Sequence, residues 1–255
     1  MKQFFGKTLF VFAALILVLG MVPGCATTGT AVQNTFTETG FLNRVMQVEG
    51  LESRYVVYLP IDYDPTVPMP LILFLHGSGE RGNDGLLSTA VGLPHAVRCH
   101  TERFPCLVVI PQCPDNDWWS SPNGMAIAEA AMDAVISEFL VDLNRVYLTG
   151  LSMGGFGSWT LAVKMPERFA AVIPICGGGN PDDAPVLATL PIRVFHGAKD
   201  TVVKPEQSRI MVEAILAEGG DIEYVEYPDA EHNSWDLTYR DADVIAWLLS
   251  QSREK

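Results

Sequence analysis

Two short segments of the chain, Leu71–Leu75 and Cys106–Ile110, are apolar at every position. A strand with one face in water alternates apolar and polar side chains, whereas a strand that is apolar on both faces must be covered on both sides. Helices that pack on the two faces of a parallel sheet provide that cover. The two segments therefore predict an α/β fold with a mostly parallel, twisted sheet between two layers of helices.

The alternation of strand and helix patterns continues to the end of the chain. Further strands are expected at 54–59, 145–149, 171–175, 192–196 and 222–227, and helices at about 125–140, 154–165, 205–218 and 238–250. Hydrophobic residues make up 48% of the chain and charged residues 18%, which is enough apolar material for one large core. We expect a single folded domain over residues 36–255.

The first 24 residues have the pattern of an export signal. Lys2 and Lys7 precede an apolar run over residues 8–22, and this run ends at Pro23 and Gly24. The run is shorter than the roughly 20 residues that a membrane-spanning helix needs. Residues 22–25, Val-Pro-Gly-Cys, resemble the lipobox of bacterial lipoproteins, which implies a lipid on Cys25.

We therefore expect a lipoprotein-type signal peptide over 1–24, a flexible tether over 25–35 and the folded domain over 36–255. The protein would be exported and held on a bacterial membrane by its lipid. Two alternatives stay open, namely ordinary secretion with a chance cysteine at position 25 and a permanent transmembrane anchor.

The charge of the chain excludes two kinds of partner. It has 17 Lys and Arg against 30 Asp and Glu, a net charge of −13, and no basic cluster, so nucleic acid is not expected as a partner. The same acidity excludes attraction to anionic lipid headgroups. A membrane contact would depend on the lipid at Cys25, and the sequence does not indicate an oligomeric state.

The motif that carries chemistry is Gly150–Gly154, with the sequence Gly-Leu-Ser-Met-Gly. It follows the expected strand 145–149 directly and precedes a helix, which is the context of a nucleophile elbow. The turn is so tight that a side chain at 150 or 154 would collide with neighbouring backbone. Ser152 would stand at a helix amino terminus, where free N–H groups favour developing negative charge. We predict that Ser152 is the nucleophile.

A serine hydroxyl needs a base, and the base needs a group that orients it. In this architecture the order along the chain is serine, acid, histidine. Asp200 and His232 each follow an expected strand, so both would lie with Ser152 at the carboxyl edge of the sheet. We predict a triad of Ser152, Asp200 and His232. The rival acids Asp229, Glu231 and Asp236 are nearer to His232 in the chain but would each have to fold back within its own loop.

An oxyanion hole is expected beside the elbow. One donor is the N–H group of Met153, the residue after the nucleophile. The second should come from the glycine-rich loop His76–Gly82 after strand 71–75, where Ser78 is the expected donor.

The remaining histidines and cysteines do not predict a metal site or a cofactor. His76 and His196 each end a strand before a glycine and are expected to be structural, and no pair has metal-ligand spacing. Cys113 and Cys176 follow strands separated by two others, which is roughly 14 Å at ~4.8 Å per strand and too far for a disulfide or a shared metal.

The four cysteines after Cys25 could pair in three ways. Cys99 and Cys106 are close in the chain and in a loop-like stretch, so a bridge between them is favoured.

Four motifs together resemble one group of enzymes: His76–Gly82, Pro111–Pro114 with the Trp118–Trp119 pair, Gly150–Gly155, and His232–Trp235. They are similar to the α/β-hydrolase carboxylesterases related to dienelactone hydrolases, feruloyl and acetylxylan esterases and polyhydroxybutyrate depolymerases. The resemblance implies an α/β-hydrolase fold and a serine esterase without cofactor. Dienelactone hydrolases proper use a cysteine nucleophile, so Ser152 departs from their reaction.

Two features bear on the substrate. Only residues 177–191 separate two expected strands where related lipases insert a lid, so we expect no large cap and an open site for a bulky or polymeric ester. Trp118, Trp119 and Trp235 lie in loops at the catalytic edge, and aromatic faces stack on sugars and phenolic rings. The ordinary alternative is that some of these tryptophans pack in the core. We expect the substrate to be an ester of a small molecule or a polysaccharide, either carbohydrate-linked, which is favoured, or phenolic.

Two other functions stay open. One is a serine peptidase of the prolyl-oligopeptidase type, and the other is a lipid-anchored binding protein that keeps the fold without catalysis.

Overall fold

The computed structural model describes residues 38–253 of the chain. The expected signal peptide, the tether over residues 25–35 and Cys25 lie outside the described residues. Among residues 38–253, none of the helices combines the length and the apolar character that crossing a membrane requires.

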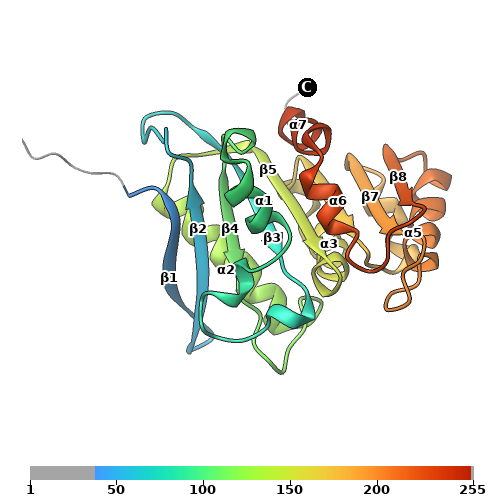
Figure 1. The fold of residues 1–255 in the computed structure, drawn as a ribbon, viewed down its shortest axis with the longest axis horizontal. Helices are drawn as coiled ribbons and strands as arrows, with labels where there is room; N and C mark the ends of the chain where they lie inside the picture. Colours follow the sequence, from blue (N-terminus) through green and yellow to red (C-terminus); the bar gives the residue numbers. More distant parts are fainter. Residues whose placement is uncertain (1–37, 254–255) are drawn as a thin grey trace, which may run out of the picture. The chain divides into compact units, whose positions relative to one another are not determined.

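The described residues form an eight-stranded sheet in the order β1-β2-β4-β3-β5-β6-β7-β8 (Figure 1). Strands β3 to β8 pair in parallel, whereas β1 pairs with β2 and β2 with β4 in antiparallel fashion. The strands are β1 (Gly40–Val48), β2 (Leu51–Leu59), β3 (Met69–Leu75), β4 (Leu107–Pro111), β5 (Val141–Leu151), β6 (Ala171–Ile175), β7 (Ile192–Gly197) and β8 (Ile222–Tyr227). The mostly parallel sheet that the sequence predicts is confirmed.

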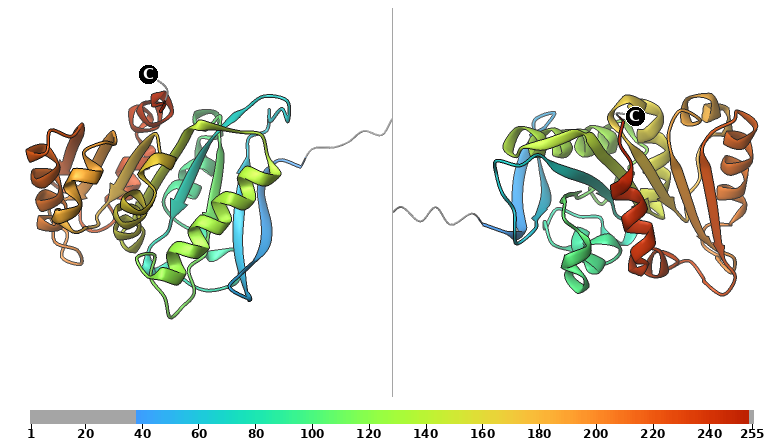
Figure 2. Two further views of the ribbon diagram at one scale, coloured as in Figure 1. Left: turned by 180° about the vertical axis from the view of Figure 1, so that it is seen from behind. Right: turned by 90° about the horizontal axis from the view of Figure 1, so that it is seen from above.

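Helices cover both faces of the sheet (Figure 2). One face packs against α2 (Pro122–Glu138), α3 (Met153–Lys164), α4 (Ala184–Leu187) and α5 (Glu206–Ala217). The other packs against α1 (Leu93–Cys99), α6 (Trp235–Arg240) and α7 (Ala242–Ser250).

The central strands divide their side chains between these two layers. In β3, Leu71 and Leu73 belong to the core of the first face, whereas Ile72 and Phe74 belong to the core of the second. This division explains why Leu71–Leu75 is apolar at every position.

Two elements differ from the sequence prediction. The expected helix 238–250 is two helices, because the side chain of Asp241 accepts a hydrogen bond of 2.9 Å from the N–H of Asp243 and begins α7 there. The sequence does not predict β1, because this half-exposed edge strand has a mixed sequence without a clear strand pattern.

Between β6 and β7, residues 177–191 form only a 3-10 turn and the four-residue α4, so the expected absence of a large cap is confirmed.

Both ends of the described chain lie at the same edge of the sheet. Because β1 is antiparallel to β2 and β2 to β4, Gly40 stands where the parallel strands begin. At the other end of the chain, the N–H of Arg253 donates a 3.0 Å hydrogen bond to the carbonyl of Asn144, near the start of β5. The carboxyl ends of the parallel strands form the opposite edge.

The turn between β5 and α3 allows no side chain at Gly150 or Gly154, the two glycines of the motif. A Cβ atom at Gly154 would overlap the carbonyl oxygen of Leu75, and one at Gly150 would overlap the carbonyl oxygen of Gly154. The backbone of the turn therefore lies directly against the end of β3, as the motif at 150–154 predicts.

This contact gives a stability prediction for Gly154→Ala. The added methyl group meets backbone atoms that cannot rotate away, so the free energy of unfolding should fall by about 1–3 kcal/mol. Gly79→Ala is the matched control, because its Cβ would meet nothing within 4 Å. Urea denaturation followed by tryptophan fluorescence measures both variants, and equal midpoints would show that the contact is not rigid.

Candidate active site

Ser152 sits in a strained turn between β5 and α3. It immediately follows β5, and its φ of 53° and ψ of −117° lie outside the regions that non-glycine residues prefer. Its N–H donates a 3.0 Å hydrogen bond to the carbonyl of Ile175 at the end of β6. The turn holds the hydroxyl at the carboxyl edge of the sheet, at the amino terminus of α3.

The structure brings Ser152, Asp200 and His232 together. Asp200 lies in the turn after β7, and His232 lies in the turn between β8 and α6. Nε2 of His232 is 2.9 Å from Oγ of Ser152, and Nδ1 is 2.7 Å from Oδ2 of Asp200.

The rival acids are engaged elsewhere or exposed. Asp229 pairs with Lys199 at 2.6 Å, and Asp236 accepts a 3.2 Å hydrogen bond from Asn233.

Asp200 is buried and fully hydrogen-bonded. Its Oδ1 accepts hydrogen bonds of 2.8 and 2.9 Å from the N–H groups of Val202 and Val203. Burial alone would raise the pKa of this carboxyl, but the hydrogen bonds from His232 and the two amides outweigh it and lower the pKa below its ordinary value. The side chain is therefore a carboxylate at neutral pH, and it fixes the proton of His232 on Nδ1. Nε2 is left to accept the hydroxyl proton of Ser152.

Two amide groups beside Ser152 are available as donors. Met153 is the first residue of α3, and Ser78 is the first residue of a 3-10 turn that follows β3. Leu75 and Gly150 pair across β3 and β5, so the segments that carry the two amides start from adjacent strand ends. Within residues 38–253, neither N–H donates a hydrogen bond.

His76 and His196 are buried beneath this edge. The N–H of Cys113 donates a 3.0 Å hydrogen bond to Nε2 of His76, so Nδ1–H of the neutral ring donates to the carbonyl of Gly77 at 2.6 Å. Burial lowers the pKa of His76 to about 4. His196 lies between Ser208 and the carbonyl of Val203, at 2.8 and 2.9 Å. Both rings have the structural place that the sequence predicts.

The three tryptophans do not share one environment. Trp119 is 1% exposed and donates a 2.9 Å hydrogen bond from Nε1 to the carbonyl of His76. Its rings belong to the core, which corrects the expectation that Trp119 contacts a substrate. Trp118 is 49% exposed, with the guanidinium of Arg81 5.8 Å from its ring centre. Trp235 is partly buried and packs edge-on against His232, with ring centres 5.3 Å apart.

The cysteines also differ from expectation. Cys99 is exposed and Cys106 is buried, and both are free, so the favoured bridge between them is not formed.

One group of residues could in principle hold a metal ion. Ligand atoms of Cys176, Asp200 and His232 lie within 4.8 Å of one another. A metal needs the thiolate form of cysteine, whereas burial raises the pKa of Cys176 to about 12. It would also displace the hydrogen bond between His232 and Asp200. The geometry fits a hydrogen-bonded triad better than a metal centre.

Comparisons with known proteins relate this chain to ester hydrolases. The Dienelactone hydrolase family model matches residues 117–240. A probable feruloyl esterase C from Aspergillus niger is 28% identical over 250 residues, which cover 93% of this chain and 84% of the relative.

Two solved structures share the fold. The crystal structure of a thermostable esterase is 37% identical with a TM-score of 0.75, and the match covers 84% of this chain and 63% of that one, so this chain spans less than two thirds of it. A feruloyl esterase module from Clostridium thermocellum, in complex with sinapinate, has a TM-score of 0.67 at 18% identity, over 83% of this chain and 88% of the module.

The fold and these relatives define the chain as an α/β-hydrolase, an enzyme that acts on carboxylic ester bonds. More particularly, it is similar to the dienelactone hydrolases over residues 117–240 and to feruloyl esterases over most of its length.

The buried, neutral His76 predicts acid sensitivity. In the unfolded chain its pKa is about 6.5, whereas in the folded protein it is about 4. The unfolded state therefore binds more protons between these values, and stability is lost as the pH falls from 7 to 4. The loss due to His76 should be about 3 kcal/mol.

Urea denaturation of the protein and of His76→Gln at pH 7, 6, 5 and 4 measures this difference, since glutamine keeps an acceptor for Cys113 but cannot titrate. Proton uptake on unfolding at pH 5.5, measured by calorimetry in two buffers, gives a second readout that needs no variant. The same pH dependence in both proteins, together with no proton uptake, would contradict the assignment.

Proposed function

We propose that the protein is a serine carboxylesterase that works through an acyl-enzyme on Ser152, with His232 as base and Asp200 as the acid that orients it. The observation that carries the proposal is the continuous hydrogen-bonded line from Asp200 through His232 to Ser152, at 2.7 and 2.9 Å. Nucleophile, base and orienting acid in this order are what ester hydrolysis by serine requires.

The proposed reaction has two halves. Oγ of Ser152 attacks the carbonyl carbon of the ester and its proton passes to Nε2 of His232. The free N–H groups of Ser78 and Met153 donate hydrogen bonds to the carbonyl oxygen and stabilise the negative charge that develops on it. His232 then gives its proton to the leaving alcohol, and water releases the acid from Ser152 by the same steps in reverse.

Several observations support a phenolic or carbohydrate-linked ester as substrate. The exposed ring of Trp118 stands in the loop after β4 at the catalytic edge, and no large cap covers that edge in residues 38–253. Relatives that span most of this chain are named feruloyl esterases. An open site with an aromatic surface suits an ester carried on a polysaccharide.

The first test is hydrolysis of an ester panel by the full-length protein and by Ser152→Ala. The panel contains acetyl, butyryl, octanoyl and feruloyl esters and acetylated xylan. Removal of the nucleophile should lower kcat by at least about 10⁴-fold, and Asp200→Asn should lower it about 10⁴-fold because the histidine then takes the wrong tautomer. Ser250→Ala, which removes an exposed hydroxyl at the end of α7, is the control and should retain activity.

The outcomes separate the alternatives. Hydrolysis that persists in Ser152→Ala would contradict the nucleophile. A folded protein that cleaves peptides but none of the esters would be a peptidase, and one that cleaves neither would be a binding protein.

We also propose export with a lipid on Cys25, supported by the motif at residues 22–25. Expressed in a bacterium with radiolabelled palmitate, the protein should carry label and sediment with membranes. Cys25→Ser should lose the label. A protein that carries no label and is found free after export would contradict the anchor and favour ordinary secretion.

A further inference from the structure

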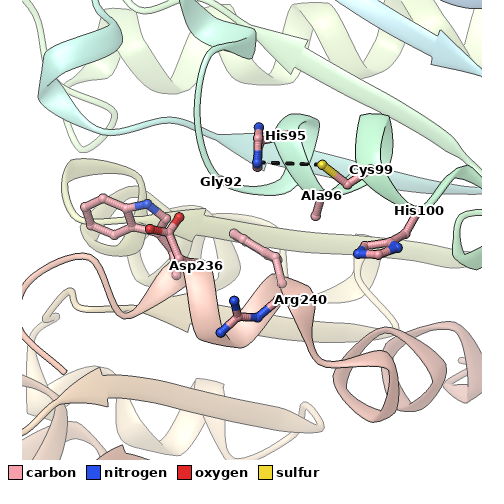
Figure 3. A pocket seen from close by; sticks show the side chains of 9 residues that line it. Gly92, His95, Ala96, Cys99, His100, Asp236 and Arg240 are labelled. Atoms are coloured by element: carbon pink, nitrogen blue, oxygen red, sulfur yellow. Dashed lines mark hydrogen bonds between the residues drawn. The ribbon is translucent and has the colours of Figure 1, made fainter. Parts of the chain in front are cut away.

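A cavity of about 300 Å³ lies between α1 and α6 (Figure 3). Its lining includes Trp235, whose ring packs edge-on against His232. Among residues 38–253, however, none of the groups that the proposed reaction uses lines this cavity. The cavity therefore does not reach the reacting atoms, and the support for those atoms has to come from the loops at the catalytic edge.

Arg81 joins two of these loops. It follows the 3-10 turn Ser78–Glu80 in the loop after β3. Its Nε donates a 3.0 Å hydrogen bond to the carbonyl of Ser78, and Nη1 donates one of 3.4 Å to the carbonyl of Asp117 in the loop after β4. Its guanidinium also lies 5.8 Å from the ring centre of Trp118. Arg81 thus ties the loop of the proposed oxyanion donor to the neighbouring loop.

The backbone on the amino-terminal side of Ser78 is held by hydrogen bonds to the carbonyl of Gly77. That carbonyl accepts a 2.6 Å hydrogen bond from Nδ1–H of His76 and one of 3.3 Å from the N–H of Glu80. The Ser78 N–H belongs to the same planar peptide unit as this carbonyl, so the two bonds also set the direction of the N–H.

Arg81 holds the peptide unit on the other side of Ser78. Ser78 and Gly79 are exposed, and glycine allows a wide range of backbone angles. Packing therefore restrains this part of the turn little, and its geometry depends on hydrogen bonds such as the one from Arg81 to the Ser78 carbonyl. With both adjoining peptide units held, the Ser78 amide has one direction.

The shape of the guanidinium matters more than its charge in this arrangement. Within residues 38–253, Arg81 pairs with no carboxylate, although the chain has 30 Asp and Glu against 17 Lys and Arg. Its N–H groups bind two backbone carbonyls in fixed directions. A planar guanidinium can do this, whereas the ammonium group of lysine is a compact point charge on a flexible stem.

We propose that Arg81 is a positioning residue for the oxyanion hole. By holding the carbonyl of Ser78, it keeps the Ser78 N–H directed at the carbonyl oxygen of the ester. The inference rests on the proposed function and adds to it a residue that acts through Ser78. Its effect falls on the chemical steps rather than on substrate binding, because the oxygen becomes an anion only as the tetrahedral intermediate forms.

The experiment measures hydrolysis of 4-nitrophenyl acetate by the full-length protein, by Arg81→Met and by Arg81→Lys. Both variants should lower kcat by about 10-fold, because outright loss of one oxyanion donor costs roughly 10²–10³-fold and these changes only loosen a donor. Formation and hydrolysis of the acyl-enzyme both pass through an oxyanion, so both slow together and KM should stay within about 2-fold.

Arg168→Met is the matched control. Arg168 precedes β6 at the opposite edge of the sheet and pairs with Asp133 at 2.6 Å. This variant loses a guanidinium in the same way and should keep kcat and KM. The urea midpoints of all three variants should stay close to that of the parent protein, since each side chain is partly exposed.

A second readout uses an alkyl trifluoromethyl ketone as an inhibitor. Oγ of Ser152 adds to the ketone carbon, the hydroxyl proton passes to Nε2 of His232, and the electron pair of the C=O double bond moves to the oxygen, which becomes an anion in the oxyanion hole. The inhibition constant should rise about 10-fold in Arg81→Met and Arg81→Lys, in parallel with the loss of kcat/KM. A merely structural arginine would change the urea midpoint without this parallel.

The outcomes separate the role of Arg81 from the proposed function. Parent values of kcat and of the inhibition constant in both variants would overturn the positioning role. Full activity in Arg81→Lys alone would assign the effect to charge, and a raised KM with unchanged kcat would assign it to substrate binding, so either result also overturns it. A parent protein that neither hydrolyses the ester nor binds the ketone would contradict the proposed function, and the role of Arg81 with it.

Discussion

The contact between the backbone of the elbow and the end of β3 is the constraint on which the site depends. Because Gly150 and Gly154 carry no side chain, the start of α3 reaches the carbonyl of Leu75. That approach sets the start of α3 against the beginning of the loop after β3, which carries Ser78, the second amide of the proposed oxyanion hole. Strain at Ser152, whose φ is positive, is tolerated because pairing of β5 with β3 and β6 holds the turn on both sides.

Hydrogen bonds rather than solvent stabilise the charged and polar groups under the site. The Asp200 carboxylate is out of contact with water, and two backbone amides and His232 replace its hydration. His76 and His196 are buried in the neutral form, with both ring nitrogens satisfied by neighbours. Buried hydrogen bonds therefore hold the groups of the proposed triad in place, and protonation of the buried rings would disturb them.

The sequence predicts what depends on local pattern and chain order, and misses what depends on contacts between distant segments. The apolar strand 71–75 and the order of Ser152, Asp200 and His232 are visible in the chain, because each follows from periodicity or from the fixed succession of strands. Trp118 and Trp119 look alike in sequence, yet only Trp119 is buried. The carbonyl of His76 accepts a hydrogen bond from its Nε1, and Gly157 leaves room for it because it has no side chain. The cavity between α1 and α6 joins segments about 140 positions apart and has no local signal.

The edge at which β1 begins has a consequence for access to the site. Gly40 enters the sheet at the edge where the parallel strands start, and the reactive groups lie at the far edge, one strand length away. The flexible tether that the sequence predicts over residues 25–35 would join the domain at this edge and would leave the domain free to turn. The tether then does not lie across the catalytic edge, and a large substrate can approach the reactive groups without meeting it.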